Sequence, residues 1–188
     1  MKRSADLLFL AVVVLFASGC AKLMLKHTPL TAAAQAVAPV ALVVKDSRAP
    51  EFGGGDEFYV ARLRNLYGMP IKFQAENSMT QAVRALFADA LTASGYSVVE
   101  GSPVQVEVDI KMFFMDGYLG YKIDTQFDVR VVSAGAVAHQ VPISEVLAFS
   151  YMSNSDMYAA FDQLMNKIAQ DAVAAFGNPA FKTAVAPQ

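Results

Sequence analysis

Two stretches of the chain carry apolar residues at the spacing of an amphipathic helix, which presents one apolar face to a core. The first stripe is Met79, Ala82, Val83, Leu86, Phe87, Ala90 and Leu91. Asn77 or Ser78 is placed to cap its start, and Gly95 suits a left-handed end. The second helix starts near Ser155 and stops at residues 177–179, which read Gly-Asn-Pro. Its stripe is Met157, Phe161, Leu164, Met165, Ile168, Ala172 and Phe176.

Strict alternation marks two further stretches, residues 104–112 and 121–131, as strands with one apolar and one polar face. Such a pair predicts an antiparallel hairpin that packs on one side only. Residues 39–44 are continuously apolar, which predicts a central strand. Shorter strands are expected at residues 58–63, 69–73, 96–99 and 143–151.

These elements predict a two-layer α+β fold, in which a mainly antiparallel sheet carries both amphipathic helices on one face. We expect a single domain over residues 39–180, with residues 181–188 as a C-terminal tail. The chain has 188 residues, which is enough for one domain with a buried core.

Residues 1–19 have the pattern of a secretory signal peptide. Lys2 and Arg3 precede an apolar run of ten residues, Leu7–Phe16, followed by small residues. Because about 18–20 apolar residues are needed to cross a bilayer, this run favours a cleaved leader. An uncleaved anchor helix is the alternative.

The only cysteine of the chain, Cys20, follows that leader directly. Residues 17–20, Ala-Ser-Gly-Cys, resemble the lipobox of bacterial lipoproteins, in which cleavage leaves the cysteine as an acylated first residue. The resemblance implies that Cys20 is lipidated, and several acyl chains anchor a protein stably. The alternative is a secreted protein with a free thiol. Ala21 stands where an Asp marks retention in the inner membrane, which favours the outer membrane.

Residues 20–38 are predicted to form the acylated cysteine and a flexible tether, because they are rich in Ala and lack a clear period. As a flexible coil this segment would span about 25 Å, and at most about 60 Å when extended. We therefore expect the domain to stand away from the membrane surface.

The polar face of the hairpin brings carboxylates together in either of two registers. With residues 117–118 as a two-residue turn, Lys111 faces Asp124 and Glu107 faces Asp128. A register shifted by two residues sets Asp109 against Asp128. Paired carboxylates can divide acid and base roles between them. The competing interpretation is an open face on which water screens the charges.

The tip of the hairpin is too apolar for a free turn. Its candidate contact residues are Phe113, Phe114, Met115, Tyr118 and Leu119. Aromatic residues and Met are enriched at interfaces, so the tip is a candidate surface for a partner protein or lipid. Alternatively, it folds over the rim of the core, close to Tyr67, Met69, Tyr151 or Met152.

Asp46 and Arg48 follow the first strand, where binding residues often lie. An Arg at this place can hold a phosphate or a carboxylate. The competing interpretation is structural: Asp46 caps a turn and Arg48 pairs with it or with a neighbour.

Composition narrows the possible chemistry. With 15 basic and 17 acidic side chains and a pI near 5.6, no nucleic-acid partner is expected. His27 lies in the predicted tether and His139 in a predicted loop, without a second ligand at metal spacing, so no metal is expected. Residues 53–55 are three glycines without the Gly-Lys-Ser/Thr of a phosphate-binding loop. We expect no cofactor and no enzymatic activity.

The order of elements resembles the YajG-like lipoprotein family of Gram-negative outer membranes. The matching stretches are residues 43–48 (Val-Val-Lys-Asp-Ser-Arg), residues 91–96 (Leu-Thr-Ala-Ser-Gly-Tyr) and the hairpin strands. The family's members are small lipoproteins that face the periplasm, without an established enzymatic activity. The resemblance therefore implies the acylated cysteine at Cys20 and carries over no catalytic residue.

Three functions follow as hypotheses. The first is a non-enzymatic lipoprotein that faces the periplasm from the outer membrane and binds another envelope protein as an accessory subunit. The hairpin tip and the exposed sheet edges would make that contact. The second is a lipid- or glycan-binding accessory protein of an envelope transport system, which requires an apolar groove or a basic patch. The third is an enzyme that uses the paired carboxylates.

Overall fold

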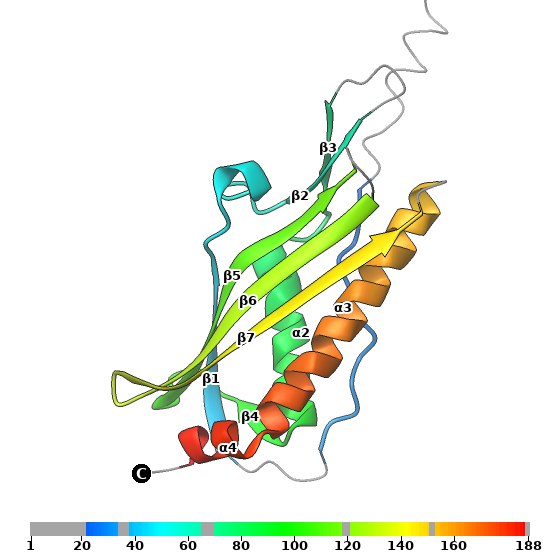
Figure 1. Cartoon of the computed structure of the whole chain (residues 1–188). Helices are drawn as coiled ribbons and strands as arrows, with labels where there is room; N and C mark the ends of the chain where they lie inside the picture. Colours follow the sequence, from blue (N-terminus) through cyan, green and yellow to red (C-terminus); the bar gives the residue numbers. More distant parts are fainter. Residues whose placement is uncertain (1–21, 34–37, 65–69, 118–120, 151–152, 187–188) are drawn as a thin grey trace, which may run out of the picture.

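A mixed sheet forms one layer of the protein and helices cover one of its faces (Figure 1). The computed structural model describes residues 22–33, 38–64, 70–117, 121–150 and 153–186. The elements are β1 (Ala38–Asp46), η1 (Pro50–Phe52), β2 (Tyr59–Arg64), β3 (Pro70–Gln74), α2 (Met79–Ala93), β4 (Tyr96–Val98), β5 (Val104–Asp116), β6 (Tyr121–Ser133), β7 (Ala136–Phe149), α3 (Asn154–Gly177) and α4 (Pro179–Val185). The predicted two-layer α+β fold is confirmed.

Strand β5 is the centre of the seven-stranded sheet. One of its edges pairs with β6 along almost its whole length, and β6 pairs in turn with β7. Its other edge pairs first with β1 and then with β2, both in parallel. Strand β4 lies beside β1, and β3 lies beside β2. Most of the ladder is antiparallel, as predicted, and β1 lies in the interior of the sheet.

The register of the β5–β6 hairpin is the second of the two predicted registers. Asp109 pairs with Asp128, and Asp116 pairs with Lys122. The alternative with a two-residue turn is therefore excluded, because β5 ends at Asp116 and β6 begins at Tyr121. A β-bulge lies between Ile110 and Met112, and it shifts the alternation of the remaining strand by one residue.

Helices α2 and α3 lie side by side on the inner face of the sheet (Figure 1). Ser78 caps α2, because its Oγ accepts a hydrogen bond from the Gln81 N–H at 3.2 Å, and Gly95 follows the helix with φ of 91°. The Phe87 ring of α2 meets Phe127 of β6 edge-on, with centroids 5.6 Å apart. Both predicted stripes are buried.

The N-terminal segment departs most from the predicted tether. Residues 22–33 run in an extended course along the helical layer, and the side chains of Leu23 and Leu25 are buried in the core. Two hydrogen bonds join the side chain of Asn77 to the backbone of Leu25, at 2.9 and 2.8 Å. Residues 22–33 are therefore part of the domain, whose predicted start at residue 39 is too late.

The predicted C-terminal tail also begins with structure. Helix α4 follows α3 after Asn178, whose Oδ1 accepts a hydrogen bond from the Ala180 N–H at 2.9 Å. Its Phe181 is fully buried, with its ring 4.7 Å from that of Phe176. Residues 177–179 end one helix and start the next, because Pro is well placed in a first turn.

Candidate functional site

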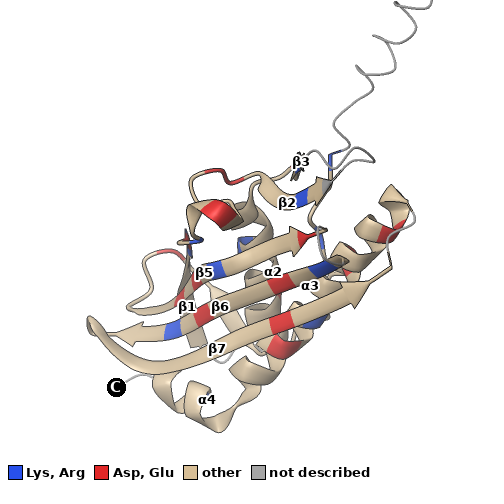
Figure 2. Cartoon of the chain, turned by 45° about the horizontal axis from the view of Figure 1, so that its top comes forward, with Lys and Arg blue, Asp and Glu red and all other residues tan. Residues whose placement is uncertain are grey.

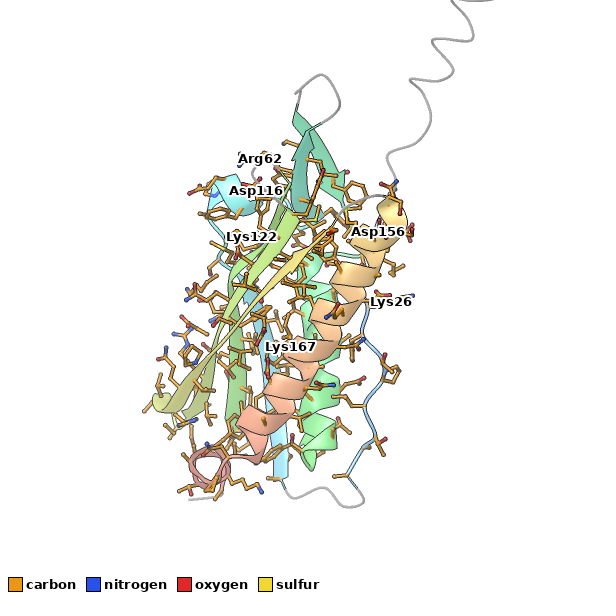
Figure 3. All side chains as sticks on the ribbon, turned by 45° about the vertical axis from the view of Figure 1, so that its right-hand side comes forward. Lys26, Arg62, Asp116, Lys122, Asp156 and Lys167 are labelled. Carbon is orange, nitrogen blue, oxygen red and sulfur yellow. The ribbon has the colours of Figure 1, made fainter. Side chains whose placement is uncertain are left out.

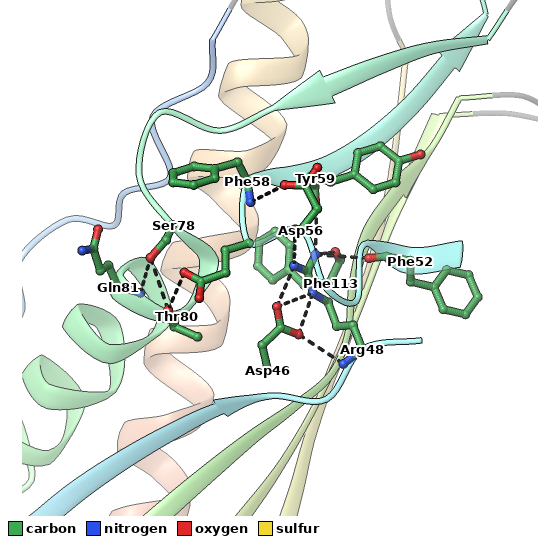
Figure 4. Close-up of polar contacts among 11 residues, drawn as sticks. Asp46, Arg48, Phe52, Asp56, Phe58, Tyr59, Ser78, Thr80, Gln81 and Phe113 are labelled. Atoms are coloured by element: carbon green, nitrogen blue, oxygen red, sulfur yellow. Dashed lines mark hydrogen bonds and ion pairs between the residues drawn. The ribbon is translucent and has the colours of Figure 1, made fainter. Parts of the chain in front are cut away.

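Asp46 and Arg48 form an ion pair inside the protein, at the end of β1 (Figure 4). Arg48 Nε lies 2.9 Å from Asp46 Oδ1, and Arg48 Nη2 lies 2.8 Å from Asp46 Oδ2. The side chain of Arg48 has no exposed surface. This two-bond geometry is the strongest form of a carboxylate–guanidinium contact.

The remaining Arg48 donors bind backbone carbonyls of the surrounding loop and strands. Nη1 donates to the carbonyls of Phe52, Tyr59 and Phe113, at 3.1, 2.8 and 3.3 Å, and Nη2 donates to that of Asp56 at 3.3 Å. Arg48 thus joins β2, β5 and the loop around η1. Because every guanidinium nitrogen already has a protein acceptor, the structure supports the structural interpretation of this pair over ligand binding.

Arg48 also explains why glycines occupy residues 53 and 54. A Cβ added to Gly53 would lie 2.8 Å from Arg48 Nη1, and one added to Gly54 would lie 1.8 Å from the Arg48 carbonyl oxygen. The loop therefore wraps closely around Arg48 only because residues 53 and 54 have no side chain. Searching the sequence for the spacing of a phosphate-binding loop does not reveal that these glycines make room for Arg48.

The candidate contact residues of the hairpin tip are buried where the structure describes them. After the bulge, Phe113 and Met115 point into the core, and the ring of Phe113 stacks on Phe161 of α3 with centroids 6.0 Å apart. Phe114 points to the opposite face, where it packs against Phe52 and Tyr59. These three residues are therefore not a contact surface, and their apolar character serves packing. Tyr118 and Leu119 lie outside the described residues, as does Cys20.

The outer face of the sheet carries charges of both signs in alternation (Figure 2). Glu107 of β5 forms ion pairs with Lys45 of β1 and Arg130 of β6, at 3.5 and 3.2 Å. Further pairs join Lys122 to Asp124 and Arg62 to Asp116. Interspersed ion pairs of this kind are typical of a solvated face and not of a patch with charge of one sign.

Asp109 is the buried member of this outer face, with 7% of its surface exposed. Burial alone would raise the pKa of Asp109, but hydrogen bonds from Lys111 and Ser47, with the charges of Lys111 and Arg130, hold that pKa below its usual value. Its neighbour across the ladder is Asp128. A general acid needs a carboxyl group whose pKa is raised, and the pKa of Asp109 is shifted in the opposite direction, so Asp109 does not suit that role.

The two histidines lie apart. His27 Nε2 is 2.9 Å from Asp89 Oδ2 of α2, and it holds the N-terminal segment against that helix. His139 lies on β7 rather than in a loop, with its ring edge-on to Phe181. Within the described ranges, three or more possible metal ligands are nowhere grouped, and no helix is both long and apolar enough to span a membrane.

The residues that hold the N-terminal segment against the helices were not identified from the sequence. Thr28 donates its N–H to Asn166 Oδ1 of α3 at 2.7 Å, and Ala33 donates to the Thr92 carbonyl of α2 at 3.2 Å. A signal was present in residues 22–26, Lys-Leu-Met-Leu-Lys, in which the two leucines alternate with exposed residues. Surface hollows of about 200 and 310 Å³ follow this segment, and charged residues line both.

Comparison with solved structures supports the fold. A protein from Xanthomonas campestris superposes with a TM-score of 0.58 at 14% identity, covering 79% of this chain and 89% of that one. An uncharacterised protein gives a TM-score of 0.51 at 13% identity, covering 82% and 97%. A lipoprotein from Neisseria meningitidis gives 0.40 at 12% identity over 71% and 99%, a similarity too low to carry an argument.

No curated protein sequence matches the chain. A family model described as "uncharacterized lipoprotein" matches residues 27–174, which include the N-terminal segment from His27 onward and all but the end of α3. This match covers most of the domain. The chain therefore belongs to this family of uncharacterised lipoproteins.

Proposed function

We propose that the protein is a non-enzymatic lipoprotein, anchored through acylated Cys20 to the periplasmic face of the outer membrane, that binds another envelope protein as an accessory subunit. Membership of a lipoprotein family supports the anchor. The edge of strand β7 that faces away from β6 supports the binding role.

Strand β7 is 14 residues long, and within the described part of the chain it pairs with β6 alone. The backbone N–H of Glu145 points toward β6, because it donates a hydrogen bond to Thr125 Oγ1 of that strand at 3.2 Å. Peptide groups alternate along a strand, so those of Ser144 and Val146 point away from β6. This edge offers free donors and acceptors to an added strand.

The side chains along this edge fit a contact with a protein. Val146 is 62% exposed and Val137 is 55% exposed. Pro142 occupies another outward position, where it removes one N–H and limits how far a foreign strand can pair. The segment from Ile143 to Phe149 is therefore the most suitable length of edge for a partner.

Photo-crosslinking in intact cells tests the binding role. A benzophenone amino acid at Val146 is expected to form a discrete adduct with an envelope protein. The same group at Gln105, exposed on the outer face of β5, serves as the control. Ser144→Pro removes an outward N–H without breaking the β6 ladder, so we expect it to reduce the Val146 adduct at least five-fold with unchanged thermal unfolding. A Val146 adduct no stronger than that at Gln105 would refute this contact.

The anchor has its own test. Cys20→Ala is expected to abolish metabolic labelling with palmitate and to leave an uncleaved or soluble chain. Membrane fractionation of the native chain is expected to place it with the outer membrane. Continued palmitate labelling of Cys20→Ala would contradict lipidation at this residue.

A further inference from the structure

The course of residues 22–33 fixes which end of the domain lies nearest the anchor. Leu23 forms a parallel bridge with Ala75, just beyond β3. Its N–H donates to the Gln74 carbonyl at 3.2 Å, and its carbonyl accepts the Glu76 N–H at 2.8 Å. Because the two segments are parallel, the chain before Leu23 leads toward the start of β3.

The register of the sheet shows what else lies at that end. One continuous row of paired residues crosses it from β3 to β7: Lys72, Arg62, Asp116, Lys122 and Ala148. Helix α3 begins at the same end, whereas the β6–β7 turn, β4 and α4 lie at the opposite end (Figure 1). Figure 3 shows Arg62, Asp116 and Lys122 gathered together near the tips of β2 and β3. We call this the anchor end.

Chain length then limits the distance to the membrane. Two residues, Ala21 and Lys22, separate Cys20 from buried Leu23, so three Cα–Cα steps join the two and their Cα atoms lie at most about 11 Å apart. The 13 residues of β6 span about 43 Å, which places the β6–β7 turn far from the anchor. The expected stand-off of up to about 60 Å is thus replaced by close approach.

The anchor end carries exposed cations that can reach phospholipid headgroups. Lys22, Lys72, Arg62 and Lys122 are all exposed cations. Asp116 pairs with Arg62, and Asp156 is held by the backbone of Ser153 at the start of α3. Lys122 also pairs with Asp124, and Glu76 lies beside Leu23, so the described charges at this end are mixed. Anionic headgroups attract each exposed Lys or Arg weakly, so it is the short chain between Cys20 and Leu23 that favours this end.

We propose that the anchor end rests against the phospholipid headgroups of the membrane that carries the protein, with the β6–β7 turn pointing away from it. This orientation depends on the proposed anchor at Cys20. It also leaves the long edge of β7 roughly along the membrane normal, where a strand from a neighbouring envelope protein can reach it.

Depth-dependent quenching tests the orientation. The acylated full-length chain is reconstituted into vesicles of phosphatidylethanolamine and phosphatidylglycerol that contain headgroup-nitroxide lipids. A thiol-reactive fluorophore is placed by Lys122→Cys at the anchor end, or by Ala136→Cys beside the β6–β7 turn as the matched control. Both positions are exposed. We expect several-fold stronger quenching at position 122 than at position 136.

A linker variant adds the critical control. Twelve Gly and Ser residues inserted between Ala21 and Lys22 leave the lipobox intact and remove the length limit, so quenching at position 122 should fall toward that at position 136. Equal quenching at both positions in vesicle-bound native chain would overturn the orientation alone. Failure of the native chain to bind vesicles, with no lipid in the mass of its N-terminal peptide, would overturn the anchor and the orientation together.

Discussion

Arg48 and Asp46 form a two-bond ion pair, with Nη2 and Oδ2 2.8 Å apart, in which the arginine side chain is completely buried. The pair lies where β1, β2, β5 and the loop around η1 meet. A buried charge is costly without partners, and here the carboxylate and four carbonyls supply them. Asp46 and Arg48 therefore stabilise the junction of these elements.

Removing that arginine should be strongly destabilising. Arg48→Met leaves the largely buried Asp46 carboxylate without its guanidinium partner and four carbonyls without their donor, so we expect the free energy of unfolding to fall by about 3–5 kcal/mol in urea titrations. Arg48→Lys should recover only part of this loss, because an ammonium cannot form the planar fork. Arg62→Met is the control, since its pair with Asp116 is half exposed and should contribute about 1 kcal/mol or less. Equal effects at positions 48 and 62 would contradict this account.

The glycine loop should tolerate no side chain at residue 54. A Cβ there would overlap the Arg48 carbonyl oxygen, so Gly54→Ala must displace the loop, and we expect a loss of about 2–4 kcal/mol. Gly177→Ala serves as the matched control, because no atom lies within 4 Å of its added Cβ. That variant should be neutral or more stable by up to about 1 kcal/mol. Thermal unfolding of the two variants decides between the expected outcomes.

Phe113 should behave as a core residue. Phe113→Ala removes the ring that stacks on Phe161, and we expect a loss of about 3–5 kcal/mol in the free energy of unfolding. Phe58→Ala is the comparison, because Phe58 is 43% exposed and should lose less than about 1 kcal/mol. If Phe113→Ala unfolds at the same urea concentration as the native chain, the tip is not packed as described.

Asp109 should make stability depend on acidic pH. Its pKa is lower in the folded chain than in the unfolded chain, so its contribution is present above the unfolded pKa of about 3.9 and is lost as the pH falls through the folded pKa. Asp109→Asn should therefore be less stable by about 1–2 kcal/mol at pH 7, and the difference should shrink below pH 4. Asp128→Asn should be neutral or slightly stabilising, because it removes a like charge opposite Asp109. Urea midpoints at pH 7 and pH 3 measure both effects.

Asn77 should control how firmly the N-terminal segment is held. Asn77→Ala removes both hydrogen bonds to Leu25, and we expect trypsin to cleave after Lys26 at least several-fold faster. Asn166→Ala removes only the bond to Thr28 and should have a smaller effect. Cleavage of the native chain at the rate of Asn77→Ala would show that the segment is not packed on the domain.

Periodicity predicted the helices well because their stripes are long and face a single core. The stripe from Met79 to Leu91 is buried along its whole length, and Ser78 caps it as expected. The hairpin strands were also predicted, yet their side-chain directions failed beyond Lys111. One extra residue at the bulge exchanges the two faces, and strict alternation does not reveal it.

Segments that depend on distant partners were not predictable from local pattern. Leu23 and Leu25 supply only two apolar positions, and their burial requires β3 and Asn77 far along the chain. Helix α4 was missed because a Pro after Gly-Asn also ends a helix. The structural role of Arg48 was one of two alternatives, and only the arrangement of carbonyls around its buried side chain decides between them.

The docking of residues 22–33 has a practical consequence for handling this protein in solution. One way to make a lipoprotein water-soluble is to remove the lipidated cysteine together with all residues up to the first regular element. Here that cut would strip Leu23 and Leu25 from the core and expose the apolar surface beneath them. A soluble form that begins at Lys22 preserves the native domain, whereas one that begins at Ala38 is expected to aggregate.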